Sequence, residues 1–323
     1  MTAQSSLAYG STGLANRLIL TAGPCPKASN GVHHWLWRAG RALLDCPEDI
    51  AHAVIRKVVA GCGRLVTQSE ILNAIRNART LRPKNAARAW PLKNPDLVHA
   101  AVQNGMSVSS LVERSPVRPA EITHEAAIDQ LFPGDASEVL LCVGETQFHA
   151  VTRPKCALRG LFEHQQFIVP SFMSAPMGKR QDGKWSQRCL DNTGPRRFLV
   201  VESDPQKWEN LLPAEQSAFG TKDKYLAAKK DEAASVLWHL AECAPQLPLV
   251  MVVDSGGKSL HGWFLVAGME EGTVLKFFRY AVALGADPAT WTRCQWVRMP
   301  GGARDNGNKQ SVLYFNPAPM EAK

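Results

Sequence analysis

Long apolar stretches are missing from this 323-residue sequence. No uninterrupted run of hydrophobic residues approaches the roughly 20 that are needed to span a bilayer. The first residues, Met-Thr-Ala-Gln-Ser-Ser, have neither the basic start nor the apolar segment of a secretory signal. The sequence therefore predicts a soluble cytoplasmic protein with no membrane partner.

Closely spaced cysteines are also missing. The 8 cysteines are scattered and none forms a CxxC pair, which is typical of reduced, buried thiols in a cytoplasmic protein. A zinc site made of Cys142, His149, Cys156 and Cys189 is an alternative interpretation, but its loose spacing departs from structural zinc patterns. We do not expect zinc as a cofactor.

Internal repeats and long low-complexity tracts are absent as well. Hydrophobic residues make up 45% of the chain and charged residues 20%, which excludes a disordered or fibrous protein. A globular chain of this length forms either one large domain or two smaller ones.

Acidic residues are fewer than basic ones, 29 against 37. The formal net charge is +8 and the pI is about 9.1, which favours an anionic partner such as nucleic acid. Within residues 51–100 the acids are Glu70 and Asp96, whereas the basic residues are Arg56, Lys57, Arg64, Arg76, Arg79, Arg82, Lys84, Arg88 and Lys93. A solvated helical face explains this cluster as well as a phosphate-binding surface does.

The apolar periodicity changes along the chain. The first part has helical spacing, with expected helices over Val32–Leu44, Ile50–Ala60 and Glu70–Arg79. Residues 80–135 are less regular and contain several prolines, so we place the domain boundary in that stretch. The sequence predicts a basic, helical accessory domain over residues 1–120 and a second domain over residues 121–323.

The second domain mixes short strand patterns with helical ones. The expected helices are Pro205–Leu212, Lys222–Cys243 and Gly272–Leu284. The expected strands are Glu138–Cys142, Gln147–Thr152, Gln166–Val169, Arg197–Ser203, Leu247–Val253, Gly262–Ala267, Arg293–Arg298 and Ser311–Phe315. This mixture indicates an α+β or α/β domain.

Two carboxylates end the apolar strand pattern of residues 197–204. Residues i and i+2 of a strand point to the same face, so Glu202 and Asp204 project together. They repel each other unless a cation lies between them, and Mg²⁺ prefers oxygen ligands of this kind. A strand that runs into a solvated loop, with Asp204-Pro205 capping the next helix, is an equally good interpretation.

A glycine-containing loop joins two later strand patterns, in the order Asp254-Ser-Gly-Gly-Lys-Ser-Leu-His261. Glycine lets backbone N–H groups approach a phosphate, and Ser255, Lys258 and Ser259 offer further donors. His261 begins the outgoing strand and can face the same pocket. The Walker spacing is absent and a strand follows the loop. A simple hairpin with a glycine turn is the alternative interpretation.

A third segment adds another acid and more positive charge. Asp287 follows the last helical pattern, Arg298 ends a strand just before a Pro-Gly-Gly turn, and Lys309 lies in the loop beyond. These residues could join the first two segments in one site. Alternatively, Asp287-Pro initiates a turn and Arg298 is a surface charge.

In this order the three segments resemble the archaeo-eukaryotic primase superfamily, and most closely the primase-polymerases of plasmids, phages and other mobile elements. The first motif of that family, an apolar strand ending in acid-x-acid, is similar to Glu202-Ser-Asp204. The second motif, small-x-His after a Ser-Gly-rich turn, is similar to Ser259-Leu-His261. The third is a further acid, for which Asp287 is the best candidate by position. The resemblance covers about residues 135–320.

The resemblance implies an α+β catalytic domain, made of an α/β unit and an RRM-like unit and preceded by the small helical domain. It implies a DNA primase or primase-polymerase that makes primers on single-stranded DNA by metal-dependent nucleotidyl transfer, in the replication of a mobile element. Glu202, Asp204 and Asp287 would hold two Mg²⁺ or Mn²⁺ ions. The nucleoside triphosphate would be bound by Ser255, Lys258, Ser259, His261, Arg298 and Lys309.

Two features depart from the family pattern. Glu202 stands where aspartate is commoner, which lengthens one ligand by a methylene group. Asp287 lacks the usual apolar strand before it, so Asp254 remains the alternative third ligand.

The basic N-terminal domain resembles, in type only, the accessory helical modules of mobile-element primases. We expect Arg76, Arg79, Arg82 and Lys84 to contact the single-stranded DNA template. A replicative helicase is a further partner that the resemblance suggests.

Three other interpretations stay open. The first is a catalytically degenerate primase-fold protein that binds nucleic acid in replication. The second is a different metal-dependent phosphotransferase or nuclease, because acid-x-acid strands serve those chemistries too. The third is a purely structural DNA-binding protein, which explains the charge but not the carboxylate pair or the phosphate-type loop.

Overall fold

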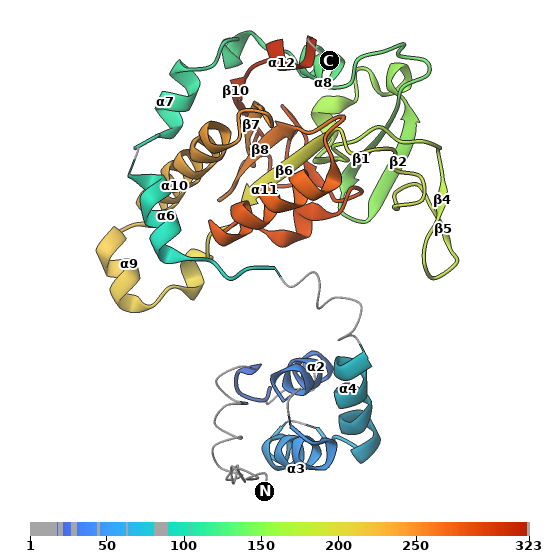
Figure 1. Ribbon diagram of the computed structural model, residues 1–323, viewed down its shortest axis with the longest axis vertical. Helices are drawn as coiled ribbons and strands as arrows, with labels where there is room; N and C mark the ends of the chain where they lie inside the picture. The colour runs from blue at the N-terminus through green and yellow to red at the C-terminus, as the bar shows by residue number, and fades with distance from the viewer. Residues whose placement is uncertain are drawn as a thin grey trace, which may run out of the picture. The chain divides into compact units, whose positions relative to one another are not determined.

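The computed structural model describes residues 18, 22–26, 31–43, 46–62, 64–80, 90–103 and 105–321, with the backbone alone at 79 and 80. The chain divides into two compact units, residues 1–89 and 90–323 (Figure 1). Each unit has a hydrophobic core of its own. No helix in these described ranges is both long and apolar enough to cross a membrane.

The first unit contains α2 (Val32–Ala42), α3 (Glu48–Val59) and α4 (Gln68–Thr80). The helices expected in this part of the chain are therefore present, with ends that differ by a few residues. One apolar stripe of α2, including Trp35 and Leu36, is buried. Gly40 lets α2 approach α4 closely, because a Cβ atom there would lie 2.9 Å from the Ala74 carbonyl oxygen.

The second unit begins at Trp90 rather than at the predicted residue 121. Two short helices, α6 (Pro95–Val102) and α7 (Val108–Glu113), lie in the stretch that the prolines had marked as a boundary. Val98 and Leu111 on these helices join the core of the second unit. The prolines of this region begin short helices without ending the domain.

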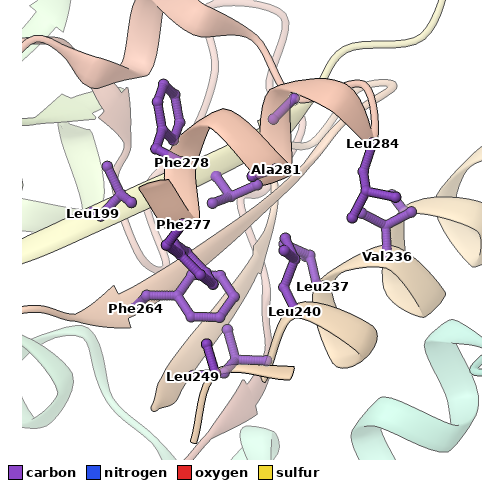
Figure 2. Close-up of a cluster of buried hydrophobic side chains, with 14 of the residues drawn as sticks. Leu199, Val236, Leu237, Leu240, Leu249, Phe264, Phe277, Phe278, Ala281 and Leu284 are labelled. Atoms are coloured by element: carbon purple, nitrogen blue, oxygen red, sulfur yellow. The ribbon is translucent and has the colours of Figure 1, made fainter. Parts of the chain in front are cut away.

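A four-stranded antiparallel sheet is the centre of the second unit. Its order is β10-β7-β8-β6, formed by β10 (Val312–Phe315), β7 (Leu249–Asp254), β8 (Leu260–Leu265) and β6 (Phe198–Ser203). Two helices, α10 (Lys222–Cys243) and α11 (Glu271–Ala283), contribute to the core on one face of this sheet. Figure 2 shows side chains of both helices meeting Phe264 of β8 and Leu199 of β6.

The other face of that sheet packs against a second antiparallel sheet. The second sheet has the order β2-β1-β3-β9, formed by β2 (His149–Pro154), β1 (Leu140–Thr146), β3 (Phe167–Ile168) and β9 (Val297–Arg298). Leu141 and Val143 of β1 share a core with Phe198 and Val200 of β6, and α8 (His124–Leu131) adds Ile128 to it. Because β6 is buried on both faces, its sequence is a continuous apolar run until Glu202.

The remaining elements are short. The strands β4 (Gly178–Lys179) and β5 (Trp185–Ser186) form a hairpin that is a separate two-stranded sheet. The helix expected over Pro205–Leu212 is wrong, because that stretch holds one 3-10 turn and the helix α9 starts at Pro213, where proline suits a first turn. The short helical elements are η2 (Pro119–Glu121), η3 (Lys155–Leu158), η4 (Phe162–His164), η5 (Trp208–Asn210), α9 (Pro213–Phe219), η6 (Pro288–Trp291) and α12 (Ala318–Glu321). Helices and antiparallel sheets together confirm the α+β class.

Candidate active site

Glu202 is the centre of the candidate site. It is paired with His261 across β6 and β8, and side chains of directly opposed residues lie on the same face. The Nε2 atom of His261 lies 3.3 Å from Oε1 of Glu202. The Ser259 hydroxyl donates a hydrogen bond of 3.0 Å to the same oxygen. The register of one strand pair thus joins the acid-x-acid and small-x-His segments.

The Glu202 carboxyl is ionised although its side chain is only 21% exposed. Burial by itself would raise its pKa. Attraction to His261, the hydroxyl of Ser259 and the positive charge of Arg298 outweigh that effect and lower the pKa from 4.5 to about 2. The site therefore offers a half-buried carboxylate that is anionic at neutral pH.

Asp204 forms an ion pair with Lys258. The Nζ atom of Lys258 lies 2.9 Å from Oδ1 of Asp204 and donates a hydrogen bond of 2.6 Å to the Pro205 carbonyl oxygen. The Asp204 side chain is 47% exposed. Lys258 thus ties the glycine-containing loop to the end of β6.

Asp287 lies beside β6 through its backbone. Its N–H donates a hydrogen bond of 2.8 Å to the Glu202 carbonyl oxygen, and the neighbouring Ala286 bridges to Ser203. Its carboxylate accepts a hydrogen bond of 2.9 Å from the N–H of Ala289 and caps η6. Asp287 therefore initiates a turn, as the alternative interpretation expected, and also lies next to the strand that carries Glu202.

Asp254, the alternative third acid, has a different position. It ends β7, and β8 lies between β7 and β6 in the sheet. Its two carboxylate oxygens are engaged by the Lys230 ammonium at 2.7 Å and by the Gly256 N–H at 2.9 Å. Asp287 has a direct backbone bond to Glu202, so it is the better placed of the two acids.

Within the described ranges, no three His, Cys, Asp or Glu side chains are grouped so that they could hold a metal ion. Glu202 faces Ser259 and His261, Asp204 faces Lys258, and Asp287 caps a helix. The donor chemistry fits Mg²⁺ or Mn²⁺, because all three are carboxylates and Glu202 is held ionised. The Asp204 and Asp287 side chains would have to rotate away from Lys258 and the Ala289 N–H to bring their oxygens to an ion bound by Glu202.

The zinc candidates are dispersed over several elements. Cys142 is buried on β1, and burial raises its pKa to about 12. The Cys189 thiol donates to Oδ1 of Asn192 at 3.3 Å, while Cys156 is exposed in η3 and His149 begins β2. The Cys142 thiol is therefore protonated at neutral pH, and Cys189 is engaged by an amide.

The phosphate-type loop has a closed internal structure. Ser255 is buried, and its hydroxyl accepts a hydrogen bond of 3.2 Å from the N–H of Ser259. Gly256 has a φ of +67°, a conformation that favours glycine. Ser255 thus shapes the loop, whereas Ser259 presents its hydroxyl to Glu202.

A second loop, residues 303–309, covers the glycines. The Asn308 side chain donates to the Gly256 carbonyl oxygen at 2.8 Å, and Arg304 donates to the Ser255 carbonyl oxygen at 3.4 Å. A Cβ atom on Gly256 would lie 2.7 Å from the Lys309 carbonyl oxygen. Gly256 is therefore required where the two loops meet. Sequence reasoning did not assign a role to Arg304, because only this long-range contact brings it to the site.

Arg298 is a half-buried cation beside the site. Its guanidinium lies 4.6 Å from the centre of the Phe167 ring, and its Nη1 atom is buried with no hydrogen-bond partner in the described part of the chain. Burial and the nearby Arg304 lower its pKa from the usual value, against the attraction of Glu202. This unpartnered donor is suited to an anionic ligand.

Lys309 approaches the glycine-containing loop through its backbone carbonyl oxygen, which lies beside Gly256. Lys309 also lines a cavity of about 620 Å³ together with Gly301, Gln310 and His124. Gln310 is completely buried, and neither atom of its side-chain amide has a hydrogen-bond partner in the described residues. Spacing in the sequence carries no signal for Gln310, because its burial depends on the fold of the loop.

The four residues expected to contact DNA in the first unit have separate outcomes. The Arg76 guanidinium lies 3.2 Å from a Glu48 carboxylate oxygen. Arg79 is part of α4, and its side chain is not described. Arg82 and Lys84 lie outside the described residues. The expected DNA contact of this unit stays a prediction.

The chain matches no family model, and no curated protein or solved structure matches it significantly. The function is therefore inferred from the geometry of the site.

Proposed function

We propose that this chain is a primase-polymerase of the archaeo-eukaryotic primase type, which makes primers on single-stranded DNA by metal-dependent nucleotidyl transfer. The observation that carries the proposal is the pairing of β6 with β8. It sets a half-buried, ionised Glu202 against Ser259 and His261, with Arg298 nearby. A carboxylate beside donors for a phosphate is what a nucleotidyl-transfer site requires.

The architecture supports the finer fold assignment. A four-stranded antiparallel sheet with α10 and α11 against one face has the two-layer arrangement of an RRM-like unit, with the difference that the last strand, β10, pairs with β7 and not with β6. The second sheet, with α8, would correspond to the other unit of the catalytic domain.

Each side chain has a role that follows from its surroundings. Glu202, Asp204 and Asp287 would hold Mg²⁺ or Mn²⁺, which supplies charge neutralisation at the transferred phosphoryl group and activates the attacking 3′ hydroxyl. Ser259 and His261 would bind and orient the triphosphate, and Arg298 would neutralise its charge. Lys258 would move from Asp204 to a phosphate oxygen, and Ser255 would keep the loop in shape.

A catalytically degenerate primase-fold protein that binds nucleic acid is the second candidate. The ion pair between Lys258 and Asp204, together with the capping role of Asp287, favours it, because both contacts occupy carboxylates that the enzyme needs.

Primer synthesis separates the two candidates. The protein is incubated with single-stranded DNA, labelled nucleotides and either Mg²⁺ or Mn²⁺, and new products are resolved by length. If the protein is the enzyme, the wild type makes products and Asp204→Ala makes none. Glu138→Gln, a control at an exposed residue outside the site, makes the same products as the wild type. Undiminished synthesis by Asp204→Ala contradicts the proposed site, and absence of products from the wild type favours the degenerate protein.

A further inference from the structure

A ladder of two neighbouring aromatic side chains, with an arginine at each end, runs across one face of the β2-β1-β3-β9 sheet. The Arg188 guanidinium lies 4.3 Å from the centre of the Trp296 ring. The Trp296 and Phe167 ring centres are 5.8 Å apart, and Arg298 lies 4.6 Å from the centre of Phe167. The ladder therefore connects Arg188 with Arg298, one of the residues of the candidate active site.

This face is opposite to the one that contacts the central sheet. Trp296 and Phe167 belong to a small cluster around Cys142 and Val169. Their neighbours along the strands, Leu141 beside Cys142 and Val297 beside Trp296, point to the opposite face and lie in the core between the two sheets. The ladder is thus on the outer face of its sheet. The β4–β5 hairpin is attached to the same face through Gln187. The Thr152 N–H donates to the Gln187 side-chain oxygen at 2.7 Å, and the Thr152 hydroxyl donates to the Gln187 carbonyl oxygen at 2.6 Å.

A cavity of about 720 Å³ lies at the Arg188 end of the ladder. Phe148, Lys179, Arg180 and Arg188 are among the residues that line it, with Asp182 and Asp191 as the acids. The positive charge is only partly neutralised, since Arg180 pairs with Asp182 at 3.4 Å. In the part of the chain that the structure describes, Lys179 and Arg188 form no ion pair.

Arg188 is held in place by uncharged groups. Its Nη1 atom donates a hydrogen bond of 2.6 Å to the Cys294 carbonyl oxygen, and its plane lies over Trp296. A fixed guanidinium without a carboxylate partner keeps its charge available for a phosphate.

Two large aromatic side chains are exposed to solvent, one that lines this cavity and one on the hairpin that contributes Lys179 to it. Phe148, in the turn between β1 and β2, is 90% exposed, and Trp185 on β5 is 67% exposed. Trp185 is paired with Lys179 across the hairpin, so the two side chains lie on the same side of it. Exposed aromatic rings among basic side chains are the arrangement that stacks unpaired bases and holds their phosphates.

We propose that Phe148, Lys179, Arg180, Trp185 and Arg188, here named the hairpin surface, bind single-stranded DNA. Phe148 and Trp185 stack on unpaired bases, and the basic residues neutralise the phosphates between them. The ladder leads from this surface to Arg298, which would neutralise the triphosphate in the proposed function, so the bound strand is the template. The identity of the strand as template rests on the proposed function, whereas the binding itself requires neither metal nor nucleotide.

Binding of a labelled thymidine oligonucleotide, measured by fluorescence anisotropy without metal or nucleotide, tests the surface directly. We expect Phe148→Ala and Trp185→Ala each to weaken binding roughly 5- to 100-fold, the range of one lost base stack. Trp185→Phe keeps a ring for stacking and should retain most of the affinity. Leu92→Ala removes a side chain that is 89% exposed elsewhere and should change nothing.

Salt dependence tests the charges. Replacing Lys179 and Arg180 together by Gln should reduce the slope of log affinity against log salt by about 0.7 for each lost phosphate contact, and Lys224→Gln should leave it unchanged. The proposal is overturned if the wild type does not bind single-stranded DNA, or if the Phe148→Ala and Trp185→Ala double variant binds with unchanged affinity. Equal affinity for a duplex of the same length also overturns it, because paired bases cannot stack on these rings.

The outcome is separable from that of the proposed function. Binding that depends on Trp185, in a protein that makes no primers, leaves the surface standing and contradicts the enzyme. Primer synthesis that is unaffected in the double aromatic variant, at limiting template, leaves the enzyme standing and contradicts the surface.

Discussion

Glu202 and His261 lie opposite each other on neighbouring strands, with the imidazole Nε2 3.3 Å from a carboxylate oxygen. The pair lies at the end of β6, where the hydrophobic strand stops and half-buried polar residues begin, so that His261 is buried and Glu202 is half-buried. Two sequence segments about sixty residues apart thereby form one site, and the carboxylate keeps its charge because the histidine, a serine and an arginine surround it.

Replacing Glu202 by Gln should abolish most nucleotide incorporation. The amide keeps the shape of the side chain but removes the negative charge, so we expect a rate loss of roughly 100-fold or more for a site that acts by electrostatics. Single-turnover primer extension measures the loss. Circular dichroism checks that the variant is folded, and Glu138→Gln is the matched control on the surface. A folded variant with the wild-type rate would show that Glu202 is not in the catalytic site.

Replacing Lys258 by Gln should have two opposite effects. Its ion pair with Asp204 is partly exposed, and such pairs contribute roughly 0.2–1 kcal/mol. Loss of this competitor should therefore lower the Mn²⁺ concentration for half-maximal activity by up to about fivefold, while loss of a phosphate donor raises the KM for nucleotide. Metal and nucleotide titrations of the same variant measure both. A change in neither constant would remove Lys258 from the site.

Alanine at Gly256 should destabilise the protein more than alanine at Gly257. Gly256 has a φ of +67°, and a Cβ atom there would meet the Lys309 carbonyl oxygen, which belongs to the backbone. At Gly257 the nearest atom, 2.8 Å away, is the flexible end of the Arg304 side chain. We expect Gly256→Ala to cost about 1–3 kcal/mol of the free energy of unfolding, and Gly257→Ala to cost less. Urea unfolding of both variants gives the order, and the reverse order would contradict this packing of the two loops.

Local patterns in the sequence were enough to find the strands of the site. The apolar run of β6 ends at Glu202 because both faces of that strand are buried, and this burial is visible as composition. The contact of Arg304 with Ser255 was not predictable, because it depends on two loops that are distant in sequence. The start of the second unit was missed for the same reason. Val98 belongs to this unit through its packing with residues of α10, and the local sequence of proline-containing short helices does not indicate that packing.

The pairing of Lys258 with Asp204 illustrates another limit. Alternation along β6 correctly placed two acids at a strand end, but it could not show that a lysine from another loop neutralises one of them. Residue types in the sequence were therefore enough to propose a metal site. The side chains that contact each carboxylate became known only from the structure.

Glu70 should make the stability of the first unit depend on pH in acid. Hydrogen bonds from Arg64 and from the Thr67 backbone, together with the charge of Arg64, lower its pKa from 4.5 to about 2 against the effect of burial. A lowered pKa means that the stabilisation is complete above about pH 4.5 and is lost as the pH falls toward 2. The protection factors of the α4 amides in the full chain, which are the intrinsic exchange rates divided by the observed rates at each pH, should fall over this range in the wild type. In Glu70→Gln, the protection factors should already be lower at neutral pH and should change less with acid. An identical pH profile for the variant would show that the Arg64 contact does not hold α4.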